Sequence, residues 1–101
     1  MSERIAQLKN EYFSSGTLSE LQSQLFIAGQ WCDAAGGQTL EVFDASSGRG
    51  FTTVSAAQAE DVTRAVEAAD AAFHASWRDL KPSKRGLILA KAADLLEQQA
   101  D

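Results

Sequence analysis

The stretch that decides the fold is AEDVTRAVEAADAAFHAS, residues 59–76. Apolar side chains recur in it at three- and four-residue steps, which is the spacing of a single helix face. Its acidic residues lie towards the start, where the helix dipole favours negative charge. We therefore predict a helix over residues 59–76 with one apolar stripe. That stripe comprises Val62, Ala65, Val66, Ala69, Ala72, Phe73 and Trp77.

A second long helix is predicted from Pro82 to the end of the chain, because proline suits a first helical position. Residues 97–101 offer no Gly or Asn cap and no basic last turn, so this helix reads as cut rather than finished. We therefore expect a fragment of a longer protein. The expected buried side of the helix comprises Ile88, Leu89, Ala92, Ala93, Leu95 and Leu96.

Before the first strand, residues 1–24 are predicted to form a helical extension. A helix over residues 2–14 would place Ile5, Leu8 and Tyr12 on one stripe and stop near Gly16. A capping box at residues 17–20 (Thr-Leu-Ser-Glu) predicts a further short helical turn. The domain division is therefore 1–24 for the extension and 25–101 for the main part.

Strand-forming residues dominate the stretch between the predicted helices. Residues 25–31 and 38–44 read as strands, and the two glycines within residues 33–37 predict a β-hairpin between them. A second turn is expected at residues 45–48, followed by a strand at 51–54. The predicted class is α+β, with a small antiparallel sheet and two long antiparallel helices.

Composition narrows the function classes. The 101 residues carry a formal net charge of −5, which disfavours both nucleic-acid and membrane-surface binding. Cys32 is the single cysteine, so an internal disulfide is excluded and a reducing compartment is favoured. The start of the chain has no long apolar run of the kind found in secretory signals. We expect a cytoplasmic protein.

Five short motifs follow one another at compatible spacing between residues 25 and 101. They are FIAGQW at 26–31, DASSG at 44–48, E-D-V-x-x-A-V-x-A-A-x-x-A-F at 60–73, SWR at 76–78 and P-x-x-R-x-x-x-L-x-x-x-A-D-L-L-E at 82–97. In this order they resemble the N-terminal segment of the NAD(P)-dependent aldehyde dehydrogenase superfamily. The chain departs from the family pattern at Ala28, where asparagine is frequent, at Ala45, where proline is usual, and at Gln58, a poor helix cap.

The resemblance implies an α+β fragment of an α/β enzyme that oxidises an aldehyde to an acid with NAD or NADP. That chemistry needs an activated thiol, a general base, an oxyanion donor and a held cofactor. The family's cysteine, glutamate and cofactor-loop motifs are absent from these residues, so we expect no catalytic, cofactor-binding or metal residue here. The implied partner is the remainder of the dehydrogenase or a homologous subunit.

Each residue type that could carry chemistry has a plainer interpretation. Cys32 lies beside Asp33, which would raise a thiol pKa, and is read as incidental. His74 is read as a solvent-facing or semi-buried structural residue without ligand-spaced partners. The remaining candidates are Gly36, Gly37, Gly48 and Gly50, read as turn glycines, Glu60, Asp94 and Glu97, read as solvated charges, and Trp31 and Trp77, read as packing residues.

Three functional hypotheses remain open from the sequence. The first is a scaffolding portion of an aldehyde dehydrogenase that is inactive alone. The second is a free-standing, non-catalytic interaction module that uses the same pair of helices. The third is an isolated structural domain without a ligand.

Overall fold

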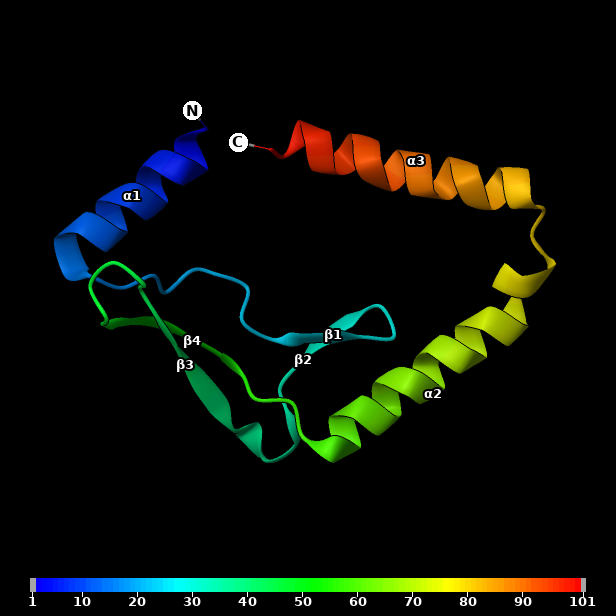
Figure 1. The fold of residues 1–101 in the computed structure, drawn as a ribbon, viewed down its shortest axis with the longest axis horizontal. Coiled ribbons are helices and arrows are strands. Elements are labelled where there is room, and N and C mark those ends of the chain that lie inside the picture. The colour runs from blue at the N-terminus through cyan, green and yellow to red at the C-terminus, as the bar shows by residue number, and fades with distance from the viewer. Residues whose placement is uncertain (1, 101) are drawn as a thin grey trace.

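In a computed structural model that describes residues 2–100, the chain forms three α-helices, two short 3-10 helices and four strands (Figure 1). The strands make two separate antiparallel pairs, β1 with β2 and β3 with β4. The predicted α+β class is confirmed. The elements follow in the order α1 (Glu3–Ser15), β1 (Leu25–Ile27), β2 (Gln30–Cys32), η1 (Ala35–Gly37), β3 (Thr39–Phe43), β4 (Gly50–Ser55), α2 (Ala59–Ala75), η2 (Trp77–Asp79) and α3 (Pro82–Gln98).

Helix α1 lies within one residue of its predicted bounds. The Ser2 hydroxyl accepts a hydrogen bond from the Ile5 N–H at 3.3 Å, which satisfies one orphan donor of the first turn. At the other end, Gly16 adopts φ +75° and its N–H donates to the Tyr12 carbonyl at 2.8 Å. Ile5, Leu8 and Tyr12 are half-buried, so the predicted stripe faces the rest of the chain. The domain division at residue 24 stays a prediction.

The short helical turn predicted at residues 17–20 is wrong, because this segment is irregular. The Ser19 N–H and hydroxyl both donate to Oε1 of Glu11, at 2.7 and 2.6 Å. The Leu18 N–H donates to the Phe51 carbonyl at 2.8 Å. The N–H groups of Leu18 and Ser19 are therefore bound to β4 and α1 and take part in no local helical turn.

The predicted pairing of residues 25–31 with 38–44 is also wrong. Residues 25–32 fold back on themselves as the β1–β2 hairpin, in which Phe26 lies opposite Trp31. Its turn consists of Ala28 and Gly29, with φ of +54° and +77°, the left-handed pair that closes a tight two-residue hairpin. Residues 33–37, read as the hairpin turn, instead lead through η1 into β3.

Strands β3 and β4 form the longer pair, and the predicted strand at residues 51–54 lies within β4. Leu40 lies opposite Val54, and an irregularity follows Val42 because Phe43 faces Gly50. The predicted turn at residues 45–48 is confirmed, closed by the Asp44 N–H, which donates to the Arg49 carbonyl at 2.8 Å.

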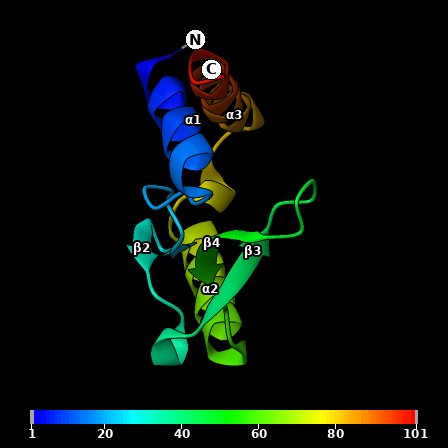
Figure 2. The same ribbon diagram turned by 90° about the vertical axis from the view of Figure 1, so that its left-hand side faces the viewer.

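Helices α2 and α3 have the predicted starts, and the chain reverses between them at η2, so that α3 runs back towards the N-terminus (Figures 1 and 2). Among the described residues, α2 contacts β1 and η2, whereas α3 packs along no other element. The two helices diverge instead of packing along their lengths. The N-terminal end of α1 lies beside the C-terminal end of α3 (Figure 2). Ile5, Leu8 and Gln98 line one cavity between them.

The predicted buried side of the second helix is exposed in this structure. Ile88 is 49% exposed and Leu89 is 65% exposed, because no described element covers them. The stripe of α2 is likewise open at Val62, Val66 and Phe73. The radius of gyration is 17.8 Å, whereas a compact domain of about 100 residues has about 13 Å. The chain is thus an open arrangement rather than a closed globule.

Candidate functional site

Asp61 forms a buried polar junction on the first turn of α2. Its side chain is 1% exposed. Its carboxylate accepts hydrogen bonds from the Gln58 N–H at 2.8 Å, from the Ala35 N–H at 3.0 Å and from the Arg64 guanidinium at 2.5 Å. It therefore closes the start of α2 and fixes the loop before β3 to that helix.

These hydrogen bonds favour the ionised carboxylate. The bond from the Gln58 N–H, then those from Arg64 and Ala35, lower the pKa of Asp61 against the opposing effect of burial. The same contact raises the pKa of Arg64. Asp61 is thus held as an anion with a structural role, and its oxygens are occupied by donors from the chain itself.

Cys32 lies at the end of β2, beside Arg64. The sequence places Asp33 beside this thiol, and the fold adds Arg64, which α2 brings across to β2. The guanidinium is already bound to Asp61 at 2.5 Å. Among residues 2–100 the cavity beside this thiol is lined by no histidine and no second cysteine, and its charged side chains are Arg64 and Glu67.

A second polar junction fixes α1 to the β3–β4 turn. The Tyr12 hydroxyl donates to Oδ2 of Asp44, and the Tyr12 ring lies edge-on to Phe51 at 6.3 Å. Asp44 also accepts from the Ser46 N–H at 2.9 Å and from the Ser47 hydroxyl at 2.9 Å. The bond from Tyr12, followed by those from Ser46 and Ser47, holds the pKa of Asp44 far below its usual range. The pKa of Tyr12 is raised in return.

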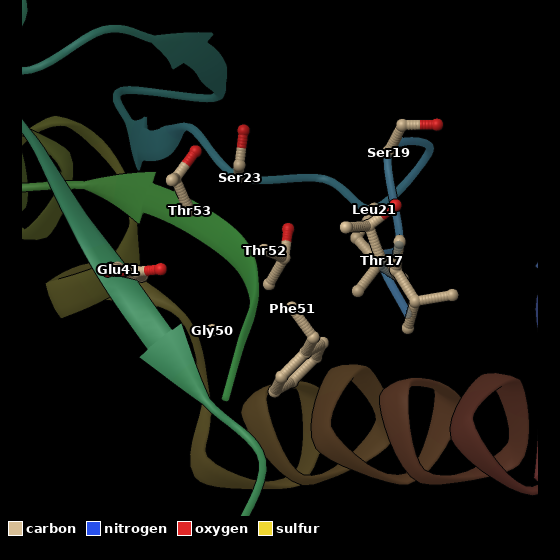
Figure 3. A pocket seen from close by; sticks show the side chains of 10 residues that line it. Thr17, Ser19, Leu21, Ser23, Glu41, Gly50, Phe51, Thr52 and Thr53 are labelled. Atoms are coloured by element: carbon tan, nitrogen blue, oxygen red, sulfur yellow. The ribbon is translucent and has the colours of Figure 1, made fainter. Parts of the chain in front are cut away.

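A hydroxyl-rich cavity of about 330 Å³ lies between β4 and the irregular segment that follows α1 (Figure 3). The side chain of Glu41 crosses from β3 towards Gly50, where a Cβ atom would lie 1.8 Å from the carboxylate. Gly50 therefore leaves room for the Glu41 carboxylate, which a larger residue at this position would displace. The cavity is lined by Thr17, Leu18, Ser19, Leu21, Ser23, Glu41, Gly50, Phe51, Thr52 and Thr53.

The other residues weighed from the sequence are scattered. His74 is exposed, and its Nδ1 lies 2.9 Å from the carbonyl oxygen of Asp70. Glu60, Asp94 and Glu97 are exposed on two different helices. Trp31 packs against Phe26 at 4.8 Å, and Trp77 begins η2. Gly36, Gly37 and Gly48 have φ values of +77°, +70° and +71°, which fits turns.

The described residues do not fit a nicotinamide dinucleotide. Such a cofactor is held where a parallel strand leads through a glycine-rich turn into a helix. Within residues 2–100 every strand pairing is antiparallel, and Gly48 and Gly50 lead into a strand rather than a helix. The same residues contain no cluster of three or more His, Cys, Asp or Glu side chains that could hold a metal ion. They also include no helix that is long and apolar enough to cross a membrane.

What the structure does present is a set of exposed apolar side chains on α2 and α3. We name it the α2–α3 apolar surface. Only Ala34 and Ala56 are buried apolar residues among those described, so most of the apolar side chains lie open. The α2–α3 apolar surface consists of the exposed side chains Val62, Val66, Phe73, Leu87, Ile88, Leu89, Leu95 and Leu96.

Comparison with known proteins fits these features. A sequence model of the aldehyde dehydrogenase family matches residues 31–101. This chain belongs to the aldehyde dehydrogenase family. It is 42% identical over 82 residues to a phenylacetaldehyde dehydrogenase of Pseudomonas fluorescens. The aligned residues cover 80% of this chain and 16% of that protein. It is 40% identical over 87 residues to an aldehyde dehydrogenase of Aspergillus niger, covering 86% of this chain and 18% of the relative.

A third relative carries the dehydrogenase segment in a longer protein. The chain is 40% identical over 83 residues to the cytosolic 10-formyltetrahydrofolate dehydrogenase of Xenopus tropicalis, covering 81% of this chain and 9% of that protein. The chain therefore spans less than a fifth of the length of the curated relatives it matches.

Neither polar junction of the chain could be predicted from the sequence analysis above. The dipole argument treats Asp61 only as an acid at a helix start, although its place three residues after Gln58 is the acidic position of a capping box. That spacing could have revealed the contact with Gln58. Neither the contact of Asp61 with Ala35 nor that of Tyr12 with Asp44 had a local signal, because each joins residues far apart in sequence.

Proposed function

We propose that this chain is the N-terminal scaffolding portion of an aldehyde dehydrogenase that oxidises an aldehyde to a carboxylic acid with NAD(P)+. By itself the chain is not catalytic. The observation that carries the proposal is the α2–α3 apolar surface, on which Leu87 is 70% exposed and Leu96 is 75% exposed. Surfaces of this kind mark places where another part of a protein binds.

The total exposed area supports the same proposal. The accessible surface of the chain is 7924 Å² for a mass of 10.8 kDa. A compact monomer of this mass exposes about 5,500 Å². The excess of about 2,400 Å² is of the order that obligate interfaces bury. The partner we propose is therefore the remainder of the dehydrogenase or a homologous subunit, and it covers the two helices.

A cytoplasmic location is part of the proposal. Its support is the single cysteine, Cys32, which suits a reducing compartment.

The test is complementation. The chain is expressed alone, and again with a phenylacetaldehyde dehydrogenase of Pseudomonas fluorescens from which the matching N-terminal segment has been removed. We expect no aldehyde-dependent NADH production from the chain alone, and production when both parts are present. Aldehyde turnover by the purified chain alone would contradict the proposal.

Paired variants on α3 sharpen the test. Leu89→Gln removes an exposed apolar side chain of the α2–α3 apolar surface, and Lys91→Gln changes an exposed polar residue two positions on. Burying a leucine contributes about 1.5–3 kcal/mol, so Leu89→Gln should weaken assembly at least about tenfold. Lys91→Gln should assemble as the unchanged chain does. Equal assembly of both variants would remove the apolar surface from the proposal.

A further inference from the structure

The outer edge of β3 has backbone groups without partners among the described residues. Hydrogen-bonded and non-bonded pairs alternate along an antiparallel ladder. The Ser55 N–H donates to the Ser23 carbonyl at 2.8 Å, so the pair of Ser55 and Thr39 is a non-bonded one. The pair of Thr53 and Glu41, two residues along, is then of the same kind. The N–H and C=O groups of Thr39 and Glu41 therefore point away from β4.

The two edges of the β3–β4 sheet differ in whether another segment of the chain lies along them. Residues 18–23 run along the outer edge of β4, where the Leu18 N–H donates to the Phe51 carbonyl at 2.8 Å. The outer edge of β3 receives no such segment in the described part of the chain (Figure 1). The side chains that flank this edge are apolar and open, since Leu40 is 59% exposed and Phe43 is 60% exposed.

A bare edge with open apolar side chains is a template for pairing with another strand. We propose that β3 is a strand-addition site, and that an extended segment from the body of the aldehyde dehydrogenase pairs with it through Thr39 and Glu41. This proposal rests on the proposed function and specifies one contact by which the scaffold joins the rest of the enzyme.

The occupant is the dehydrogenase body rather than a second copy of this chain. A symmetric antiparallel pair of β3 strands that overlaps all five residues would place Glu41 opposite Glu41 of the other copy. Like charges directly opposite one another are destabilising, and each copy carries a net charge of −5. The dehydrogenase body is the alternative source of a strand. The matched segment makes up only 16–18% of the length of two relatives, so the rest of such a protein can provide the strand.

The experiment uses the intact chain assembled with the Pseudomonas fluorescens dehydrogenase that lacks the matching segment. Hydrogen exchange is measured with single-residue resolution in the assembly. We expect the amides of Thr39 and Glu41 to exchange as slowly as those of Leu40 and Val42, which face β4. Glu41→Pro, which removes the outward N–H, should weaken assembly about tenfold, whereas Glu41→Ala should not.

The outcomes separate the two proposals. An assembly that turns over aldehyde but leaves the Thr39 and Glu41 amides in fast exchange overturns strand addition alone. Full-strength assembly of Glu41→Pro also overturns strand addition, because the assembly would then have formed without the outward N–H of residue 41. This outcome holds even if the variant is unstable in isolation. If the unchanged chain forms no assembly, the proposed function fails, and strand addition fails with it.

Discussion

Asp61 and Ala35 are joined across 26 residues of sequence, with the Ala35 N–H 3.1 and 3.0 Å from the two carboxylate oxygens. The bond ties the first turn of α2 to the loop that leads into β3. Ala34, next to this loop residue, is one of two buried apolar residues in the described chain. With so small an apolar core, this buried anion carries much of the connection between helix and sheets.

Replacing Asp61 should loosen that connection. Asp61→Ala leaves the N–H groups of Ala35 and Gln58 without acceptors at a buried position. Such a loss is one of the mechanisms that lower the free energy of unfolding most. We expect the thermal midpoint of the chain, followed by circular dichroism, to fall by several degrees. Asp61→Asn keeps one acceptor oxygen and should fall less.

The matched control for Asp61 is Asp70→Ala on the same helix. Asp70 is 72% exposed and lies 3.4 Å from the His74 ring. An exposed pair of this kind contributes little, so the midpoint should stay nearly unchanged. An equal fall for Asp61→Ala and Asp70→Ala would show that the buried junction has no special role.

The attachment of α1 should depend on pH at both ends of the scale. The ionised Asp44 has a lowered pKa, so its contribution is complete above the usual value of 3.8 and is lost as the pH falls below it. The protonated Tyr12 has a raised pKa, so its contribution is present below the usual value of 10.0 and is lost as the pH rises beyond it. Limited proteolysis near Gly16 at different pH values measures this attachment. We expect slow cleavage between these limits and faster cleavage outside them.

Tyr12→Phe tests the assignment of that behaviour. The variant keeps the ring contact with Phe51 but loses the hydrogen bond to Asp44, so the loss of attachment at high pH should disappear. Phe13→Ala is the control, because Phe13 is 81% exposed. An unchanged high-pH profile in Tyr12→Phe would assign the titration to another group.

The helices could be predicted from the sequence because their signals are local. The three- and four-residue spacing located α2, and Pro82 marked the start of α3. The packing of these helices could not be predicted, because a periodic stripe predicts a buried face without identifying what covers it. Val66 lies on the predicted stripe and is nevertheless 62% exposed.

The sheet and the junctions were harder, for two different reasons. The β1–β2 hairpin was missed because its turn places an alanine, Ala28, where a left-handed backbone usually carries Asn or Gly. The Gly36–Gly37 pair is a stronger turn signal, so the sequence predicts that residues 25–31 pair with residues 38–44 instead of folding back on themselves. The junction of Tyr12 with Asp44 joins residues 32 apart, and no local pattern encodes such a contact.

Cys32 should be dispensable for turnover in the assembled enzyme. It is half-exposed at the end of β2, and the guanidinium beside it is bound to Asp61. Cys32→Ala should therefore leave aldehyde-dependent NADH production in the complementation assay unchanged within about twofold. A change of that size corresponds to less than about 1 kcal/mol in the activation free energy. Loss of turnover in that variant, with assembly intact, would make this thiol part of the chemistry.

The β1–β2 turn offers a stabilising substitution. Ala28 has φ +54°, a conformation that costs an alanine about 1–2 kcal/mol, and Gly29 follows it with φ +77°. Asparagine adopts this region more readily, and Asn-Gly is the preferred pair for such a turn. Ala28→Asn should thus stabilise the chain by about 1 kcal/mol, which raises the thermal midpoint of a domain of this size by roughly 4–8 °C.

Ala57→Asn is the control, since Ala57 is exposed and lies outside the left-handed region, and it should give no gain. If Ala28→Asn lowered the midpoint while Ala57→Asn left it unchanged, the left-handed backbone at residue 28 would not be the source of strain.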